Sequence, residues 1–396
     1  MSKAPRRRVL VATGSRSEFG LLRPVMEAVK KQKGLTLQVA VAGEHLLGPA
    51  FTWREVAKAF RIDAKVPMQK PRDKGRAAHA AACGRGVEGF ARAISKLKPD
   101  WVVVLGDRIE AFAAASAASI AGVAVCHIHG GDRAEGIADE AMRHAITKLA
   151  HLHCAATKLS AERIVKMGEP EERVHATGSP ALDGLRSVPP LLEQRYRQLG
   201  RPMAVALVHP CGLGEPHETL GAYSAGILVR AAAHRKCGDQ RRALLLDPNH
   251  DPGSEIIRNI YSQTSDFRQV PRAAHLPRAQ FIGLLKRIRR EGGVLVGNSS
   301  AGIIEAGALG LAAINFPPRQ DGRERGRNVV DAKGMVFGPG SPRMGMLPAL
   351  RRAEKLTGKL KPSRLYGDGR AGPRIAALLA KVDPRDPALL RKRIAY

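Results

Sequence analysis

The sequence predicts an α/β fold made of two Rossmann-like domains. Three observations support this: short apolar runs alternate with helical patterns in the first half, a proline-rich stretch interrupts them at 187–202, and the same alternation restarts behind it. The expected strands are apolar throughout, which is typical of a parallel sheet covered on both faces. A chain of 396 residues also exceeds what one core organises, so two domains of roughly 150–200 residues each are expected.

The first half holds four expected strands and three expected helices. The run at 7–14 is apolar and ends in Gly14, and apolar residues recur at helical spacing from Glu18 to Lys31. The run at 101–107 begins with aromatic and β-branched residues, which strands favour. Strands are expected over residues 7–14, 35–43, 101–107 and 122–128, and helices over 18–31, 86–98 and 110–121.

The second half repeats this order of elements behind a linker. Three prolines among polar residues mark 188–202 as the linker, so the domain boundary is expected there. Strands are expected over residues 203–210, 242–249, 293–300 and 311–316, and helices over 219–234, 279–290 and 301–309. The repeated order indicates two domains of similar architecture.

Composition and charge narrow the classes of function. Lys and Arg number 65 against 36 Asp and Glu, which gives a formal net charge of +29, and a field of that sign attracts ligands that carry phosphate. Aromatic residues make up only 4% of the chain, too few for the stacking surfaces of nucleic-acid-binding proteins, so nucleic acid is not an expected partner. A general basic bias of composition is the alternative explanation of the charge.

Cysteines and apolar runs predict a soluble, cytoplasmic protein without a membrane partner. The five cysteines form no CxxC pair, so neither a zinc site nor a redox motif is indicated and reduced thiols are expected. The apolar run behind the basic start, Val9–Ala12, is too short for a signal peptide. The longest apolar stretch, 111–126, is too short to cross a bilayer.

Polar residues follow every expected strand at the end where parallel sheets bind ligands. Six such ends predict a cleft that carries chemistry, because ligands bind beyond the carboxyl ends of the strands in open parallel sheets. The six ends are Gly14-Ser15-Arg16, Gly106-Asp107-Arg108, 127–132, His209-Pro210, Asn249 and 297–300.

The segment 297–302 is the clearest of these ends. A strand ends in glycine, two serines follow, and a helix begins, so the free N–H groups of the helix and the hydroxyls of Ser299 and Ser300 predict a phosphate site. Capping of the helix by serine explains the same residues equally well. Glu305, one turn further, is a candidate acceptor for ribose hydroxyls or a favourable charge at the helix start. Neither a P-loop nor a GxGxxG motif follows any strand.

Asp107 is the first candidate for acid–base chemistry. It directly follows an apolar strand, and partial burial there raises a carboxyl pKa towards the range useful for proton transfer, unless Arg108 counters the effect. The alternative is that Asp107 caps the helix that begins at Ile109.

The charged residues at 132–148 admit two interpretations, a solvated helix face and, together with His127 and His129, a metal site. Their spacing is typical of a solvated helix face with charge pairs four residues apart. A metal site is not favoured, because His127 and His129 alternate on a strand and face opposite sides unless the chain turns there. The arginine-rich segment 319–327 is likewise either an anion-binding loop or a solvated surface loop.

Taken together, seven segments resemble the UDP-N-acetylglucosamine 2-epimerase family, and specifically its hydrolysing branch. The resemblance covers nearly the whole chain and is weakest at about 50–85, 211–240 and 335–362. The segments are VATGSRSEFG (11–20), KPDWVVVLGDR (98–108), HIHGGDRAEGIADEAMRHAITKLAHLH (127–153), VHP (208–210), GNSSAGIIEAGALG (297–310), RQDGRERGRNV (319–329) and YGDGRAGPRI (366–375).

The resemblance implies a domain plan. It implies a glycosyltransferase-B-like pair of Rossmann-like domains with the active site in the cleft between them. The plan expected from it is an N-terminal domain at 1–187, a linker at 188–202, a nucleotide-binding domain at 203–370 and a C-terminal segment at 371–396 that packs back on the N-terminal domain. A homo-oligomer, dimer or tetramer, is also implied.

The reaction implied by the resemblance releases UDP and N-acetylmannosamine for sialic-acid-type sugar synthesis. UDP is eliminated to give 2-acetamidoglucal, and water then adds with inversion at the second carbon of the sugar. Asp107 and Asp139 match carboxylates with acid–base roles, and Arg108, Arg143 and His144 match residues near the sugar. The residues that match the nucleotide and diphosphate side are Arg16, Ser17, His209, Asn249, Ser299, Ser300, Glu305 and Arg319.

One departure from the family pattern leaves the acid–base assignment open. Several members carry a catalytic glutamate where this chain has His129. The candidates for proton transfer are therefore Asp107, His129, Asp132, Glu135 and Asp139. Neither a metal nor a cofactor is implied. Two alternatives stay open: an epimerase that acts on another UDP- or GDP-linked 2-acetamido sugar, and a non-catalytic protein that binds sugar nucleotides.

Overall fold

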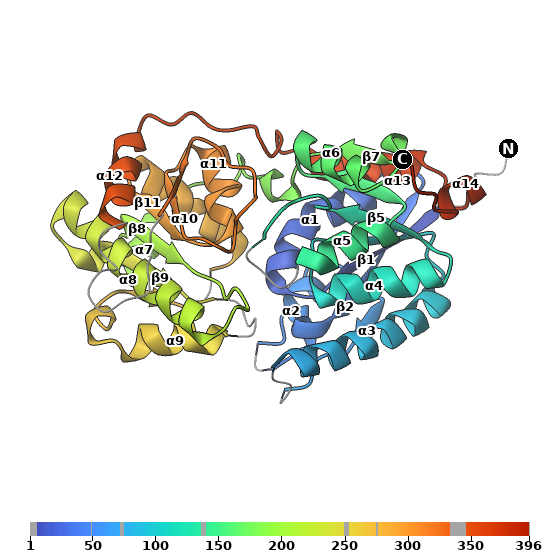
Figure 1. Ribbon diagram of the computed structural model, residues 1–396, viewed down its shortest axis with the longest axis horizontal. Coiled ribbons are helices and arrows are strands. Elements are labelled where there is room, and N and C mark those ends of the chain that lie inside the picture. The colour runs from blue at the N-terminus through green and yellow to red at the C-terminus, as the bar shows by residue number, and fades with distance from the viewer. Residues whose placement is uncertain are drawn as a thin grey trace. The chain divides into compact units, whose positions relative to one another are not determined.

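A computed structural model describes residues 6–48, 50–71, 75–135, 140–248, 253–274, 276–332 and 346–395. The chain divides into two compact units, each built on one parallel sheet (Figure 1). Unit 1 comprises Met1–Asp132, Asp139–Asp183 and Gly367–Tyr396, and unit 2 comprises Arg133–Ala138 and Gly184–Tyr366. The prediction of two α/β domains with parallel sheets is confirmed.

The sheet of unit 1 has seven strands in the order β3-β2-β1-β4-β5-β6-β7, all parallel. The chain starts in the middle of the sheet, moves to one edge and then crosses to the other, which is the order of a doubly wound fold. The strands are β1 (Arg7–Thr13), β2 (Leu35–Ala42), β3 (Ala64–Val66), β4 (Trp101–Leu105), β5 (Ala124–Ile128), β6 (Leu152–Ala155) and β7 (Val174–Ala176).

Helices cover both faces of this sheet because its central strands are apolar on both sides. Val9 and Val11 of β1 belong to one buried cluster, and Leu10 of the same strand belongs to the other. The helices are α1 (Arg16–Lys31), α2 (Trp53–Ala57), α3 (Gly75–Leu97), α4 (Ile109–Ile120), α5 (Glu140–Leu149), α6 (Lys158–Lys166), α13 (Ala371–Lys381) and α14 (Pro387–Leu390), with 3₁₀ turns over Gly43–Leu46, Glu171–Arg173 and Pro180–Leu182.

The C-terminal helices are part of unit 1. Helix α13, drawn in red, packs against α1 and shares its buried cluster (Figure 1). The Asp183 carboxylate accepts hydrogen bonds from the backbone N–H groups of Ala371 and Gly372, at 2.9 and 2.6 Å, and so binds the start of α13. At the other end, the Arg7 guanidinium donates to the carbonyl oxygen of Val382 at 2.7 Å. The side chains of Asp183 and Arg7 thus satisfy unpaired backbone groups at the two ends of α13.

The sheet of unit 2 has six parallel strands in the order β10-β9-β8-β11-β12-β13. The strands are β8 (Ala204–Leu207), β9 (Ala243–Leu246), β10 (Arg272–Ala273), β11 (Val294–Gly297), β12 (Ala313–Asn315) and β13 (Val329–Asp331). The helices are α7 (Glu193–Gln198), α8 (Glu215–Cys237), α9 (Ser254–Gln263), α10 (Arg278–Arg290), α11 (Glu305–Leu309) and α12 (Met346–Leu356), with 3₁₀ turns over Gln240–Arg242, Ser265–Phe267 and Ser300–Gly302.

Three elements differ from the sequence prediction. Helix α3 begins at Gly75, well before residue 86, because small residues fill its first turns. The helix expected over 301–309 is divided into the 3₁₀ turn Ser300–Gly302 and the short α11. The stretch 188–202 contains α7, whose Tyr196 is buried and bonded to the Pro202 carbonyl. Among the described residues, no helix is long and apolar enough to span a membrane.

Candidate active site

Arg143 gathers three groups at the carboxyl ends of β4 and β5. Arg143 is only 2% exposed, and its guanidinium binds the carboxylate of Asp107, the carboxylate of Glu140 at 2.5 Å and the carbonyl oxygen of Asp132 at 3.0 Å. The cap of α4 is Arg108 rather than Asp107, so the interpretation of Asp107 as a helix cap is wrong. The solvated-face interpretation is wrong for Arg143, because tertiary contacts bury it.

Arg108 serves a different pair of carboxylates. It donates to Glu44 at 2.6 Å and to Glu110 at 3.3 Å, so the guanidinium bonded to Asp107 is that of Arg143. Burial acts to raise the pKa of Glu110, but Arg108 and the Gln69 amide outweigh it and lower this pKa below its ordinary value. Sequence analysis missed this carboxylate, although it is the one charged residue in the otherwise alanine-rich α4.

Glu18 is a second buried carboxyl group that sequence analysis missed. It lies in the first turn of α1 beside Glu110, and burial raises its pKa to about 8. Its carboxyl group accepts a hydrogen bond from Gly14 N, while Ser15 caps the helix by accepting from Glu18 N. Gly14 allows this packing, since a Cβ there would lie 2.5 Å from Cγ of Glu110.

His129 stands at the turn that follows β5. Its φ of 66° is left-handed, so the chain turns here and His127 and His129 have different surroundings. The ring Nδ1 of His129 lies 2.8 Å from Oδ2 of Asp132, and its Nε2 lies 2.9 Å from Oγ of Ser179. The hydroxyl of Ser160 donates to the other oxygen of Asp132 at 2.8 Å. Within the described residues, no group of His, Cys, Asp or Glu could hold a metal ion.

The remaining described candidates of the first half are Arg16, Ser17 and His144, and not all of them contact the groups bound by Arg143. Arg16 pairs with Glu55 at 3.6 Å, and the hydroxyl of Ser17 lies 3.1 Å from that of Ser15. His144 is 43% exposed and its ring lies 3.7 Å from Glu140.

Three further candidates are Glu135 and Asp139 of the 132–148 segment and Asn249 of the second half. Glu135 belongs to unit 2, where its backbone N–H donates to Asp321 O and its carboxylate pairs with Arg133. It is therefore not part of the Arg143 arrangement. Asp139 and Asn249 lie outside the described residues.

In unit 2, the ends of β8 and β11 are joined through Asn298. Its side chain accepts from the backbone N–H of His209 at 2.7 Å and donates to the carbonyl of the same residue at 2.8 Å. Arg319 donates to Pro210 O at 3.2 Å, which brings the candidate arginine to the same strand ends. Gly297 is required here, because its φ is 142° and a Cβ would lie 1.9 Å from Leu207 O.

The two serines at this end differ in their contacts. Ser299 caps the 3₁₀ turn by accepting from Ala301 N at 3.4 Å, whereas no hydrogen bond of the Ser300 hydroxyl is found within the described part of the chain. Glu305 is only 5% exposed, and Oε1 of its carboxylate accepts from Arg278 at 3.1 Å. The capping interpretation therefore applies to Ser299 and not to Ser300.

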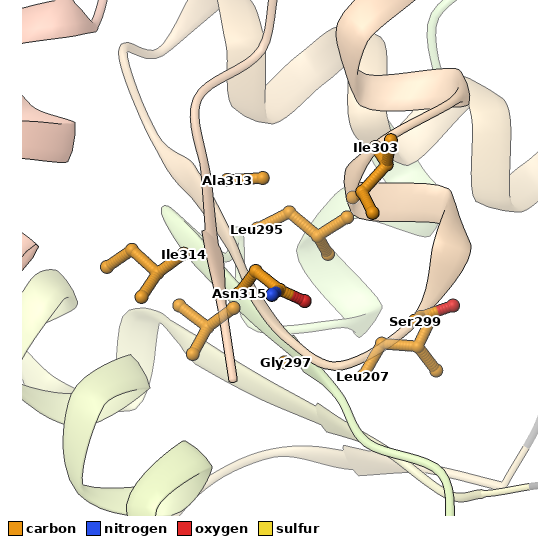
Figure 2. Close-up of a pocket in the computed structure, with 10 residues that line it drawn as sticks. Leu207, Leu295, Gly297, Ser299, Ile303, Ala313, Ile314 and Asn315 are labelled. Carbon is orange, nitrogen blue, oxygen red and sulfur yellow. The ribbon is translucent and has the colours of Figure 1, made fainter. Parts of the chain in front are cut away.

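A small pocket lies beside this turn and is lined by residues of β8, β11 and β12. In Figure 2, Ser299 and Asn315 bring the polar side-chain atoms to an otherwise apolar lining. The amide of Asn315 donates to Asp331 at 2.8 Å, which fixes its orientation. The lining residues are Leu207, Leu295, Val296, Gly297, Ser299, Gly302, Ile303, Ala313, Ile314 and Asn315.

Comparison with known proteins decides the family. The model of the UDP-N-acetylglucosamine 2-epimerase family matches residues 27–380. The chain belongs to this family. The resemblance to this family seen in the sequence is thereby confirmed, and the protein is an enzyme of the epimerase family.

Relatives within the epimerase family match most of the chain. A hydrolysing UDP-N,N'-diacetylbacillosamine 2-epimerase of Legionella pneumophila is 33% identical over 98% of this chain and 100% of its own length. A UDP-N-acetylglucosamine 2-epimerase of Neisseria meningitidis is 30% identical over 82% of this chain and 83% of its own.

Solved structures of epimerases share the fold. The Neisseria meningitidis enzyme bound to UDP-GlcNAc superposes with a TM-score of 0.73 at 19% identity, covering 95% of this chain and 100% of that one. The Methanocaldococcus jannaschii enzyme with UDP-GlcNAc and UDP gives 0.75 at 16% identity, with the same coverage. The predicted glycosyltransferase-B-like class is confirmed.

Proposed function

We propose that this protein is a hydrolysing 2-epimerase that converts UDP-N-acetylglucosamine to UDP and N-acetylmannosamine. The observation that most supports hydrolysis is the whole-length likeness to a relative named as a hydrolysing epimerase. The product would serve sialic-acid-type sugar synthesis. In this proposal unit 2 binds the nucleotide and unit 1 supplies the groups that move protons.

The proposed chemistry has two steps. In the first, the C2–H bond of the sugar breaks, its electrons form the C1=C2 bond of 2-acetamidoglucal, and the C1–O electrons leave with UDP. In the second, water gives a proton to a basic side chain as its oxygen adds to C1, and C2 receives a proton from an acidic side chain on the face opposite to the one that lost its proton. Asp107 and Asp139 are proposed for acid–base roles. The buried guanidinium of Arg143 pairs with the Asp107 carboxylate and orients it.

The nucleotide is proposed to lie at the strand ends of unit 2. The Ser300 hydroxyl and the N–H groups of the 3₁₀ turn suit a phosphate, because charge-assisted hydrogen bonds to phosphate oxygens are strong. Glu305 is proposed to accept from the ribose hydroxyls through Oε2, while Arg278 holds Oε1. His209 and Arg319 are proposed to lie on the diphosphate side.

A second substrate is supported by a specific observation. The relative from Legionella pneumophila acts, by its name, on UDP-N,N'-diacetylbacillosamine and matches more of the chain than the Neisseria meningitidis enzyme does. Both sugars carry the 2-acetamido group and the proton at C2 that the proposed chemistry requires. They differ at the fourth carbon, which carries a second acetamido group in one and a hydroxyl in the other, and at the sixth carbon, so a direct comparison of turnover decides between them.

Proton NMR in deuterated water tests the proposal. Purified protein is incubated with each UDP-sugar separately, and the expected result is free UDP together with the 2-epimeric free sugar carrying deuterium at C2. Deuterium at C2 without release of UDP would indicate a non-hydrolysing epimerase. Binding of UDP without turnover of either sugar would contradict the enzymatic proposal and favour a protein that binds sugar nucleotides.

A further inference from the structure

His127 is a fully buried histidine in a strand that otherwise carries apolar side chains. It lies near the end of β5 and is 0% exposed, and Val125, on the same face of the strand, belongs to a buried apolar cluster. A buried polar ring costs free energy unless its nitrogens are bonded. The partners of the two nitrogens therefore indicate what the histidine does at this position.

The first partner is the turn that carries Asp107. Nε2 of His127 lies 2.8 Å from the carbonyl oxygen of Gly106, and a carbonyl only accepts, so this nitrogen carries the proton. Burial lowers the pKa of His127 to about 3, which keeps the ring neutral. Gly106 has a φ of 75°, which glycine adopts readily, and its N–H donates to Ile128 O at 2.9 Å. Both backbone groups of Gly106 are thus bonded to β5.

The second partner is the helix that carries Arg143. In a neutral ring with its proton on Nε2, Nδ1 is an acceptor, and the hydroxyl of Thr147 on α5 lies 3.2 Å from it. The same hydroxyl lies 3.0 Å from the carbonyl oxygen of Arg143, one turn earlier in the helix, so its proton faces two acceptors. The contact is closely packed, because a Cβ on Gly130 would lie 2.9 Å from Nδ1 and 3.0 Å from the Thr147 hydroxyl.

His127 and Thr147 therefore connect the backbones of two residues whose side chains form an ion pair. Asp107 follows the turn that Nε2 binds, and Arg143 lies one turn before Thr147. The two members of the pair are 36 positions apart in the sequence, so tertiary contacts fix their separation. A displacement of about 1 Å at a reacting group costs up to about 10²-fold in rate. A buried link between the two backbones limits such a displacement.

We propose that His127 and Thr147 are positioning residues for the Asp107–Arg143 pair. The neutral ring holds the turn before Asp107, and the hydroxyl connects this ring to the helix of Arg143. Neither residue touches the substrate or exchanges a proton with it. The proposal rests on the proposed function, in which Asp107 has an acid–base role, and adds to it two residues that lie behind the reacting groups.

Two substitutions of His127 separate its two bonds. His127→Gln places an amide N–H near the position of Nε2, whereas His127→Asn reaches only the position of Nδ1 and leaves the Gly106 carbonyl without its donor. We expect His127→Asn to lower kcat about 10–100-fold while KM and the Kd for UDP stay within about twofold. His127→Gln should recover most of kcat.

The hydroxyl of Thr147 is tested in the same way. Thr147→Val removes the donor to Nδ1 at nearly constant volume and should lower kcat about 3–10-fold, and Thr147→Ser should restore it. In the double variant, His127→Asn should add little to the loss caused by Asp107→Asn, because a positioning residue has no further effect once the group that it positions is disabled.

His153 offers a matched control on the neighbouring strand. It pairs with His127 in the sheet register, is also 0% exposed, and its Nε2 lies 3.1 Å from Oε2 of Glu169. His153→Asn removes this bond and should lower thermal stability while kcat is unchanged. Imidazole ¹⁵N chemical shifts of the wild type should report a neutral His127 ring with its proton on Nε2, and this measurement does not depend on turnover.

The outcomes separate the two proposals. Suppose that the wild type turns over substrate while His127→Asn keeps its kcat, or loses activity only together with thermal stability and without recovery in His127→Gln. The positioning role is then overturned and the epimerase proposal stands. A His127 ring with its proton on Nδ1 would also overturn it. If the wild type turns over neither UDP-sugar, the proposed function itself fails, and the positioning role fails with it.

Discussion

At the scale of single residues, the reactive end of unit 1 depends on Arg143. A buried guanidinium is costly unless its charge is paired and its donors are bonded, and Arg143 meets this condition through Asp107, Glu140 and the carbonyl of Asp132. Asp107 lies 36 residues from Arg143 in the sequence, so the spacing of charges within the helix does not reveal this pair. That spacing alone favours the interpretation of Arg143 as part of a solvated helix face. Only the packing of α5 against α4 brings the two residues together.

The first prediction concerns Asp107. Asp107→Asn keeps a hydrogen-bond acceptor for Arg143 but removes the charge, so kcat should fall about 10²–10⁴-fold while the Kd for UDP is unchanged. The matched control is Asp100→Asn, which removes a buried carboxylate bonded to Arg385 at 2.7 Å outside the site and should leave kcat unaffected. Turnover near the wild-type rate in Asp107→Asn would exclude its acid–base role.

The second prediction separates the two serines of unit 2. Ser300→Ala should weaken UDP binding by about 1–2 kcal/mol with unchanged thermal stability, because its hydroxyl is proposed for phosphate. Ser299→Ala should instead cost about 1 kcal/mol of stability, because that hydroxyl caps the turn. Calorimetric titration with UDP and thermal unfolding of both variants test this. A reversal of the two effects would mean that Ser299 is the phosphate ligand.

At the scale of elements, the sequence predicts the central strands and misses the short ones. The strands β1, β4 and β5 are long and apolar, so pattern alone identifies them. The edge strands β3, β7 and β10 have only two or three residues, too few for any pattern, and they exist because a neighbouring strand pairs with them. The site follows the same rule: strand-end residues were predictable, but Ser179, Glu18 and Glu110 were not, because their roles depend on tertiary contacts.

The third prediction concerns the buried carboxylate of Glu169, which binds Lys392 of the C-terminal segment to unit 1. Glu169 is 1% exposed and binds His153 at 3.1 Å, Lys148 at 2.7 Å and Lys392 at 2.6 Å. Burial acts to raise the pKa of Glu169, but the three hydrogen bonds outweigh it and lower the pKa to about 2 from an ordinary 4.5. This carboxylate therefore stabilises the fold above about pH 4.5, and the contribution is lost as the pH falls towards 2.

Glu169→Gln should accordingly lower the free energy of unfolding by about 2–3 kcal/mol at neutral pH. The difference from the wild type should shrink below about pH 4.5, because the wild-type carboxylate then becomes protonated in the unfolded chain and later in the folded one. Urea unfolding at a series of pH values measures it. Glu171→Gln, an exposed carboxylate in the same loop, is the control. A difference that is independent of pH would contradict the linkage.

At the scale of the whole molecule, the order of elements that repeats along the sequence agrees with the fold of the family, since the chain forms two units that each contain one parallel sheet. Each unit presents its polar residues at the carboxyl ends of its parallel strands, and each does so with a different chemistry. Unit 1 collects carboxylates, a histidine and a buried arginine, whereas unit 2 offers hydroxyl and N–H donors. This division suits the reaction proposed above, in which unit 1 moves protons and unit 2 binds the diphosphate.

The last prediction assigns a consequence to the net charge of +29, which the reaction itself does not require. A UDP-sugar carries two negative charges on its diphosphate, so a positive field should speed its encounter with the protein, and salt should screen that field. We expect kcat/KM to fall about 3–10-fold between about 50 and about 500 mM KCl, while kcat changes little. Arg290→Glu with Arg352→Glu, both exposed and outside the proposed site, lowers the charge by four and should reduce this salt dependence. Equal kcat/KM at both salt concentrations would show that the charge does not steer the substrate, and a general basic bias of composition would then be its explanation.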